Sequence, residues 1–204
     1  MYLPEHFTEH DQEEITGLIR TNPFAIITCV SDSGELIANH IPLLMDGDST
    51  LIGHIAKANT LHKSISDGAK VLVIFRGEDS YISPNWYPTK PETHRHVPTW
   101  NYQVVHIHGK LTFTHDAKQK RGIVGKLTKY FETLTSGDAA WKMADAPKDY
   151  MDGMIDNIVG FTINIDRIEA KSKLSQNREK VDYDAVADEM AARHRENLAR
   201  VMKK

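Results

Sequence analysis

The sequence has little or none of several features that would assign it to a familiar class of protein. Its single cysteine, Cys29, excludes an internal disulfide framework and a CxxC metal site. No apolar run approaches the roughly 20 residues that a bilayer-spanning helix needs. The first residues also lack the charged and apolar segments of a secretory signal. We therefore expect a cytoplasmic protein that does not associate with a membrane.

Catalytic and DNA-binding motifs are missing as well. The chain contains no G-x-S-x-G, P-loop, H-E-x-x-H or G-x-G-x-x-G, so nucleophilic and metal-hydrolytic mechanisms lack support. Its 28 acidic residues outnumber its 25 lysines and arginines, which gives a net charge of −3. This balance, and the lack of an evident helix-turn-helix, disfavour tight direct DNA binding, although a local basic patch stays open.

The chain is instead rich in proline and aromatic residues over one stretch. Residues 80–109 contain four of the eight prolines, two of the three tryptophans and three tyrosines. Because proline cannot donate to a strand ladder, we expect most of this stretch to be loop. Rings with polar tips suit a flat aromatic ligand or a subunit interface. The alternative is a long connection whose rings cover the protein's own core.

Hydrophobic alternation and turn residues predict a mainly antiparallel β protein. The expected strands cover residues 24–30, 36–44, 50–55, 71–75, 104–113 and 158–168. Helices are expected after Asp11, Thr60, Asp116 and Pro147, and a last helix over residues 183–202. Six or seven antiparallel strands with peripheral helices indicate an α+β, mainly β fold around a small β-barrel. With no repeat or linker, we expect a single domain over residues 1–204 with a C-terminal helix.

Three clusters of polar residues are candidates for a site. A strand end followed by Lys57, Asn59, Thr60 and a helix offers a positive charge and free N–H groups to a phosphate; the alternative is a solvated lysine and a simple helix cap. Residues 171–178 form a basic loop that suits a phosphate or a polar ring edge, unless it is only a solvated loop. His106 and His108 share one strand face, but no acid or cysteine completes a metal site, so we expect no metal.

Six motifs spread over nearly the whole chain resemble the PaiB family. They are M-Y-L-P-E-H-F at 1–7, N-H-I-P-L-L at 39–44, G-H-I-A-K-A-N at 53–59, Y-I-S-P-N-W-Y at 81–87, V-P-T-W-N-Y at 97–102 and K-L-S-Q-N-R at 173–178. PaiB-like proteins are described as FMN-binding negative transcriptional regulators with a split β-barrel. That fold is similar to those of pyridoxamine-phosphate oxidases and flavin reductases, which are typically homodimers with flavin at the subunit interface. The family usually has proline where this chain has Thr60, a change we expect to alter the helix entry only slightly.

The resemblance implies FMN as the cofactor, a homodimer, and a role for each matching residue. Lys57, Asn59 and Thr60 would hold the phosphate, and four residues on two strands would lie along the ribityl chain and the isoalloxazine. Aromatic residues would close over the flavin, and three residues of the basic loop would complete the pocket. The strand residues are Pro42, Leu43, His54 and Ile55; the aromatic ones are Trp86, Tyr87, Trp100 and Tyr102; those of the loop are Lys173, Ser175 and Gln176.

Three classes of function stay open at this point. The first is an FMN-binding regulator, acting through the flavin or a small molecule. The second is an FMN-dependent oxidoreductase related to pyridoxamine-phosphate oxidase, flavin reductase or haem-utilisation split-barrel proteins. The third is a structural or binding module without flavin. A flavin ring supplies the redox chemistry itself, so an enzyme would need few diagnostic side chains.

Overall fold

The computed structural model describes residues 1–203, which form two compact units. Unit 1 comprises residues 1–22, 75–106 and 169–203, and unit 2 comprises residues 23–74 and 107–168. The strands are β1 (Phe24–Val30), β2 (Leu36–Pro42), β3 (Leu44–Met45), β4 (Thr50–Ala56), β5 (Ala69–Ile82), β6 (Thr99–Thr114) and β7 (Ile158–Lys173). The α-helices are α1 (Gln12–Thr21), α2 (Leu61–Ser64), α3 (Lys90–Thr93), α4 (Ala117–Ser136), α5 (Lys148–Asp156), α6 (Lys180–Ala192) and α7 (Glu196–Met202). Short 3-10 turns are η1 (Glu5–Phe7), η2 (Pro84–Trp86), η3 (Gly137–Ala139) and η4 (Met143–Asp145). No helix among residues 1–203 is long and apolar enough to cross a membrane.

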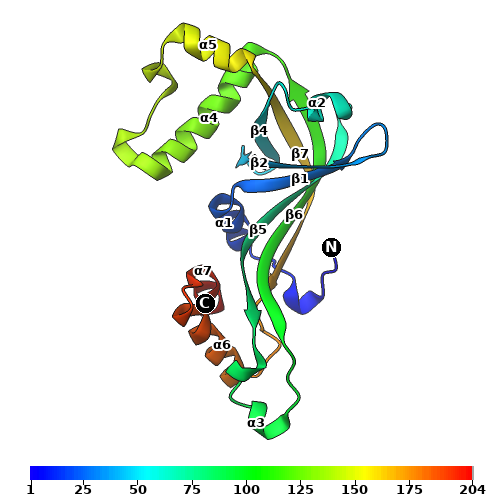
Figure 1. The fold of residues 1–204 in the computed structure, drawn as a ribbon, viewed down its shortest axis with the longest axis vertical. Helices are drawn as coiled ribbons and strands as arrows, with labels where there is room; N and C mark the ends of the chain where they lie inside the picture. Colours follow the sequence, from blue (N-terminus) through cyan, green and yellow to red (C-terminus); the bar gives the residue numbers. More distant parts are fainter. Residues whose placement is uncertain (204) are drawn as a thin grey trace. The chain divides into compact units, whose positions relative to one another are not determined.

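Unit 2 is built on an antiparallel sheet with the strand order β2-β1-β5-β6-β7-β4-β3 (Figure 1). β1 pairs with β2 on one side and with the first part of β5 on the other, and β4 pairs with β7. Alternate residues of each strand face the interior, so Ala25 and Ile27 on β1, and Phe161 and Ile163 on β7, are completely or almost completely buried. This arrangement confirms the predicted α+β, mainly β fold with antiparallel strands and peripheral helices.

The predicted strand over residues 36–44 is divided in two. Pro42 has no N–H to donate, and the amide of Leu43 donates instead to the carbonyl of Pro23 at 2.9 Å. The chain therefore leaves the β1 ladder after Pro42 and resumes as β3 beside β4. Gly53 on β4 lies in close packing, since a Cβ there would come within 2.6 Å of Phe161 and 2.7 Å of Leu43.

The helices of unit 2 begin where the sequence predicts. The Asp116 carboxylate accepts from the amide of Gln119 at 2.8 Å at the start of α4, and Pro147 precedes α5. Ile123 and Leu127 of α4 pack on Ile52 of β4. Figure 1 shows α4 and α5 side by side, joined by the extended segment that contains η3 and η4.

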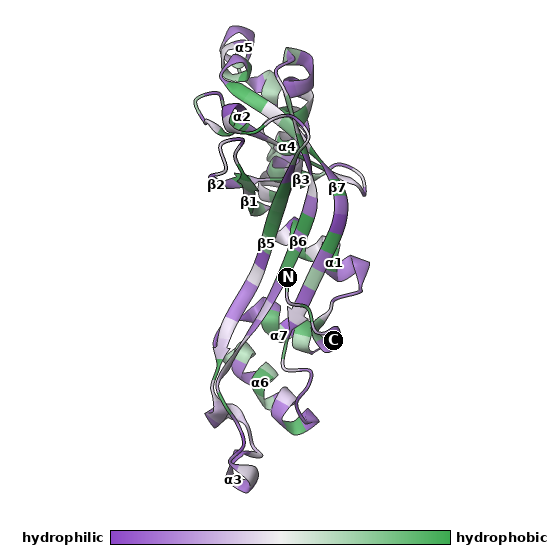
Figure 2. Cartoon of the chain, turned by 90° about the vertical axis from the view of Figure 1, so that its right-hand side faces the viewer, coloured by the Kyte–Doolittle hydropathy of each residue, from purple (hydrophilic) through white to green (hydrophobic). Residues whose placement is uncertain are grey.

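In unit 1, three strands run farther than the sequence predicts. β5 continues beyond residue 75 to Ile82, β6 begins at Thr99 rather than 104, and β7 continues to Lys173. Figure 2 shows β5 as apolar beside β1 and more hydrophilic farther along. The added lengths are mostly polar in sequence, although Asn101, Gln103 and Lys171 among them are buried. The expectation that residues 80–109 are mostly loop is therefore wrong for residues 80–82 and 99–103, which are strand.

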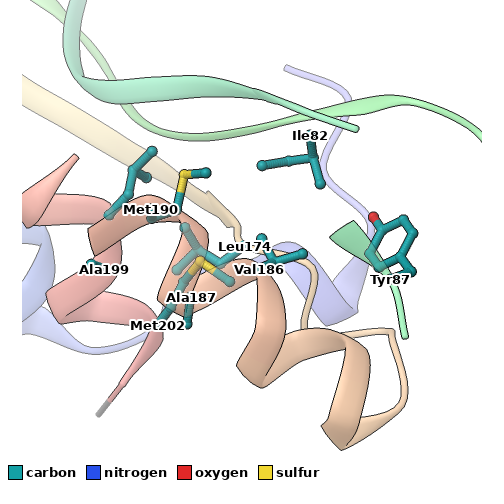
Figure 3. Close-up of a cluster of buried hydrophobic side chains, with 9 residues drawn as sticks. Ile82, Tyr87, Leu174, Val186, Ala187, Met190, Ala199 and Met202 are labelled. Carbon is teal, nitrogen blue, oxygen red and sulfur yellow. The ribbon is translucent and has the colours of Figure 1, made fainter. Parts of the chain in front are cut away.

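The predicted C-terminal helix is two helices. α6 ends before Arg193, and His194 adopts a left-handed conformation with φ of 57°, which turns the chain into α7. Val186 and Met190 of α6 and Leu198 of α7 are completely buried in one cluster that also contains Ile82 and Leu174 (Figure 3). The turn folds α7 back so that both helices bury apolar faces against the same cluster.

Candidate functional site

Unit 2 contains an apolar cavity of about 360 Å³ beside two of the predicted site residues, Pro42 and His54. The other walls come from Pro23 and from the α4 region, namely Leu127, Thr128, Phe131, Glu132 and Trp141. Sequence reasoning missed the α4 wall, because Leu127 and Phe131 read as an ordinary core stripe. The volume of the cavity lies within the range of roughly 300–1,000 Å³ that is typical of small-molecule sites.

His54 lines this cavity on the side of β4, and Thr128 and Glu132 are its other polar lining residues. The Nδ1 atom of His54 is buried and has no hydrogen-bond partner among residues 1–203. Burial lowers the pKa of the imidazole, because the charged form is poorly solvated there. A buried nitrogen without a partner is costly in an isolated protein, and a ligand satisfies it with a donor or with an acceptor according to the imidazole tautomer. The cavity therefore combines a largely apolar surface with the neutral imidazole of His54, the Thr128 hydroxyl and the Glu132 carboxylate.

Leu43 and Ile55 do not face this cavity with their side chains. Leu43 is 1% and Ile55 4% exposed, and both side chains lie in the core of unit 2. They neighbour Pro42 and His54 in sequence but point to the opposite side of their segments. Only their backbone groups are placed to meet a ligand, and their role in cofactor binding stays a prediction.

The predicted phosphate corner lies where β4 ends. Lys57 and Thr60 are exposed, and Lys57 forms no ion pair among residues 1–203. Asn59 is already engaged: its Nδ2 donates to Asn39 Oδ1 at 2.8 Å, and its Oδ1 accepts from the amide of Leu61 at 2.9 Å. Because α2 has only four residues, its dipole adds little. The corner therefore offers the charge of Lys57 on a turn that Asn59 holds in shape.

The four predicted aromatic residues, all in unit 1, fall into two pairs. Tyr87 is 2% exposed and belongs to the buried cluster of α6 and α7, with Trp86 packed against it. These two rings pack on the protein's own core, and their role in closing over a flavin stays a prediction. Trp100 is 52% exposed and lines a shallow hollow of about 490 Å³ with Arg76, Asp79, Tyr102 and Val104. Trp100 and Tyr102 are the rings that remain available to a ligand or a second subunit.

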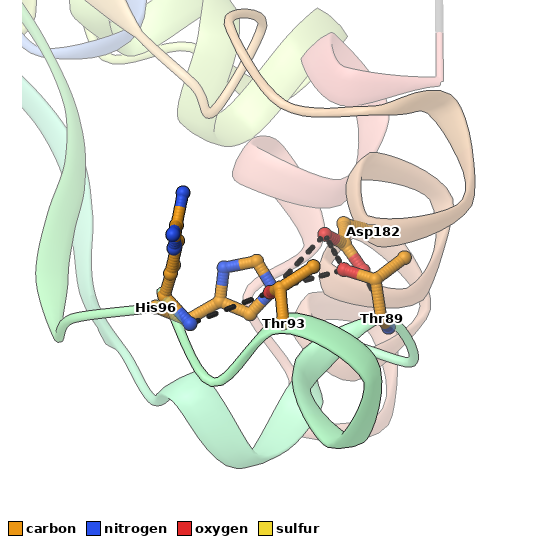
Figure 4. Close-up of polar contacts among 5 residues, drawn as sticks. Thr89, Thr93, His96 and Asp182 are labelled. Atoms are coloured by element: carbon orange, nitrogen blue, oxygen red, sulfur yellow. Dashed lines mark hydrogen bonds and ion pairs between the residues drawn. The ribbon is translucent and has the colours of Figure 1, made fainter.

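A buried polar network fastens the loop of residues 83–98 to α6 (Figure 4). The Asp182 carboxylate, 1% exposed, accepts from the amide of Thr89 at 3.1 Å and from its hydroxyl at 2.7 Å. The Thr89 oxygen also lies 2.8 Å from His96 Nε2. Since the hydroxyl proton goes to the carboxylate, His96 Nε2 is the donor in this contact. Nothing in the sequence distinguishes Asp182 from the acids around it, so this anchor was not predicted.

The basic loop is not a solvated surface loop. Lys171 and Ser175 are buried, and the Gln176 side chain donates to the Ser172 carbonyl at 2.5 Å and accepts from the Leu174 amide at 2.7 Å. Lys173 Nζ donates to Thr99 Oγ1 and to the carbonyl of Trp100. Gln176 thus shapes the loop, while the roles of Lys173 and Ser175 toward a cofactor stay predictions.

The paired histidines of β6 have protein partners in place of a metal. His108 Nε2 lies 3.1 Å from Arg167 Nη2, so Arg167 donates to the imidazole. Within residues 1–203, no group of three or more histidine, cysteine or acidic side chains is arranged to hold a metal ion. A chelating role for His106 and His108 has no geometric support in this part of the chain.

Comparison with known proteins places this chain in a family. A family model described as "Putative FMN-binding domain" matches residues 1–167. "Protease synthase and sporulation protein PAI 2" of Bacillus subtilis is 33% identical over 193 residues, which cover 93% of this chain and 89% of that protein. An uncharacterized protein of Emericella nidulans is 32% identical over 222 residues, with 91% and 88% covered.

Solved structures support the fold. The flavocytochrome Anf3 from Azotobacter vinelandii has a TM-score of 0.61 at 13% identity, over 87% of this chain and 74% of that one. The FAD and heme binding protein from Mycobacterium smegmatis has a TM-score of 0.59 at 17% identity, over 81% and 73%. At these identities the likeness concerns the split-barrel fold alone, which agrees with the prediction. Together with the family match and the motifs, it shows that the chain is a split-barrel member of the FMN-binding PaiB family, with FMN as its cofactor.

Proposed function

We propose that unit 2 binds the FMN ring in the apolar cavity beside Pro42 and His54. The observation that carries this proposal is His54, which lines a largely apolar cavity and whose buried Nδ1 has no hydrogen-bond partner among residues 1–203. An isoalloxazine combines a flat apolar edge with a pyrimidine edge that bears an N–H and two carbonyls. Such a ring would cover the apolar wall and could bring its N–H to the neutral imidazole.

The same strand leads from the cavity to the phosphate corner. Lys57 follows His54 by three residues, or about 10 Å of extended chain, a distance that a five-carbon ribityl chain can follow. We propose that Lys57 supplies the positive charge for the phosphate and that the Thr60 hydroxyl offers a donor. Asn59, already bonded to Asn39 and Leu61, would act on the phosphate by holding this turn in place.

The exposed rings of unit 1 support a homodimer. Trp100 and Tyr102 line a hollow on a strand surface, and exposed aromatic residues around a hollow are typical of interfaces and ligand sites. We propose that these rings meet a second copy of the chain and help to enclose its flavin. Dimerisation would remove the flavin from water, which strengthens the hydrogen bonds that hold it.

For the biological role, we propose a negative regulator that acts through the flavin or a small molecule rather than by reading DNA. The Bacillus subtilis relative carries a name that refers to protease synthesis and sporulation. Here, acidic residues outnumber basic ones, and the basic end of the chain includes the seven-residue α7, whose Leu198 is buried. An operator reader needs clustered phosphate contacts and a helix placed in a groove.

A second candidate is an FMN-dependent oxidoreductase. The observation that favours it is the size of the cavity wall contributed by α4, which offers apolar surface for a substrate beside the ring. When bound, the flavin would supply the electron transfer. Reduction of the loaded protein by NADH or NADPH, followed at the flavin absorption band, separates this candidate from a regulator that only senses FMN or its redox state.

The phosphate corner is tested with Lys57→Ala, titrated with FMN and with riboflavin. Because Lys57 is exposed, we expect its contact to contribute at the lower end of the free-energy range of charge-assisted hydrogen bonds. The substitution should therefore cost about a tenfold loss of FMN affinity and leave riboflavin affinity unchanged. Lys63→Ala, an exposed lysine on the adjacent α2, is the matched control. Equal losses for both ligands, or the same FMN loss in the control, would show that Lys57 does not contact the phosphate.

A further inference from the structure

The segment from Lys171 to Arg178 in unit 1 holds three cations, none of which has a carboxylate partner among residues 1–203. Lys171 is 6% exposed, and its Nζ donates to the Tyr2 carbonyl at 3.0 Å and lies 5.4–5.9 Å from the ring centres of Tyr2, Phe7 and Tyr102. These rings and the carbonyl solvate its charge in place of water. Lys171 is therefore held within the fold, and its charge acts on the neighbouring Lys173.

Lys173 and Arg178 are half-buried, and both line a small pocket. Lys173 Nζ is bonded to two neutral oxygens, on Thr99 and Trp100, and the Arg178 guanidinium lies over the Tyr87 ring at 5.1 Å. Neither forms an ion pair among residues 1–203. The pKa of Lys173 is lowered by burial and then by the charges of Lys171 and Arg178. An uncompensated positive charge is thus concentrated at one place in the fold.

These two cations line a pocket of about 170 Å³. Its other walls are Phe7, Thr99, Ser175 and Asn177, so hydroxyl and amide groups stand beside the charges. Ser175 is buried and holds a left-handed conformation, with φ of 66°, fixed in part by its hydrogen bond to Asn101 Oδ1 at 3.0 Å. The volume is well below that of a drug-sized site, so the pocket suits one small charged group.

We propose that the pocket between Lys173 and Arg178 binds a phosphate-type anion, the phosphate group of a small phosphorylated molecule. The two cations are in unit 1, whereas Lys57, the residue proposed to contact the FMN phosphate, is in unit 2. A dianion there would neutralise the excess charge of Lys173 and Arg178 and accept hydrogen bonds from both. Arginine provides a planar guanidinium with several N–H donors and lysine provides a compact ammonium charge, a combination suited to phosphate.

The test is calorimetric titration of the full-length, flavin-free protein with inorganic phosphate at constant ionic strength. We expect Lys173→Gln and Arg178→Gln each to weaken phosphate binding by about tenfold or more, since each removes a charge-assisted contact. Lys173→Arg should retain most of the affinity. Lys148→Gln, which removes an exposed charge from α5, is the matched control and should bind like the unmodified chain.

A third variant, which changes no buried side chain, separates loss of phosphate binding from loss of folding. Asn177 is exposed and lines the pocket, so Asn177→Asp adds a repelling charge with little effect on packing and should also abolish phosphate binding. Parallel titrations with FMN and riboflavin distinguish the source of the phosphate. If Lys173→Gln also removes the preference for FMN over riboflavin, the group is the flavin's own phosphate. If that preference is unchanged, the group belongs to a separate molecule.

Two results would overturn the proposal. The first is that the unmodified protein shows no more binding to phosphate than to chloride at the same ionic strength. The second is that folded Lys173→Gln, Arg178→Gln and Asn177→Asp bind phosphate as tightly as Lys148→Gln. Both results concern the flavin-free protein, so they leave the FMN site of unit 2 untouched.

Discussion

Replacing Asp182 by alanine should detach the loop of residues 83–98 from α6. The carboxylate accepts two hydrogen bonds from Thr89 inside the protein, and both donors would lose their acceptor. A buried polar group left without a partner costs about 1–3 kcal/mol. The sum, about 2–6 kcal/mol, is a large part of the about 5–15 kcal/mol by which domains are stable. The neighbouring Asp184→Ala removes only an exposed i,i+4 pair with Lys180, and should cost about 0.3–0.5 kcal/mol.

Urea unfolding followed by tryptophan fluorescence measures this difference, because Trp86 packs against the α6–α7 cluster. Limited trypsin digestion adds a local reading: Arg95 is exposed and lies in the loop, so cleavage after it should accelerate in Asp182→Ala under native conditions. Equal stability of Asp182→Ala and Asp184→Ala, with unchanged cleavage at Arg95, would refute the role of this network.

Three further predictions follow from other parts of the chain. Gly53→Ala should destabilise the protein by about 1–3 kcal/mol in thermal unfolding, because its Cβ would overlap Phe161 and Leu43; Gly17→Ala, which meets nothing within 4 Å, should not. Because the pKa of His54 is lowered in the folded protein, the unfolded chain protonates this histidine at a higher pH than the folded chain does. The free energy of unfolding should therefore decline as pH falls from about 6.5 toward the lowered pKa. His54→Phe should reduce this decline, and a pH profile of stability identical to that of the unmodified chain would contradict the prediction. Light scattering at low micromolar concentration should give about twice the 23.1 kDa of one chain, and a mass near one chain would exclude the dimer.

The sequence predicted the parts of the fold where one local rule dominates. Asp11 and Asp116 begin their helices because a carboxylate satisfies the free amides of a first turn. The apolar alternation of Phe161 and Ile163 placed β7 correctly. The ends of β5 and β7 were missed, because their outer residues are polar and their extension depends on pairing with β6, which is a long-range contact.

The candidate site also depends on long-range contacts that the sequence does not reveal. The sequence selected Lys57 and the basic loop because their residue types suit a phosphate, and His54 because of the family resemblance. It could not show that Tyr87 is buried in the cluster of α6 and α7 while Trp100 is exposed, since each comes two or three residues after a proline and next to other aromatic residues. Nor could it show that Phe131 and Trp141 of the α4 region stand opposite His54, because that contact joins segments about 80 residues apart in the chain.

Whether this chain holds FMN at a defined site is measured by the absorption spectrum of the protein after FMN is added and the excess removed. We expect FMN to remain bound at about one per chain, with its visible band altered by the apolar cavity. We also expect His54→Ala, which removes the unpartnered imidazole from the cavity wall, to retain less. A protein that is folded yet elutes with no flavin, or that retains FMN equally with His54 removed, would contradict this expectation.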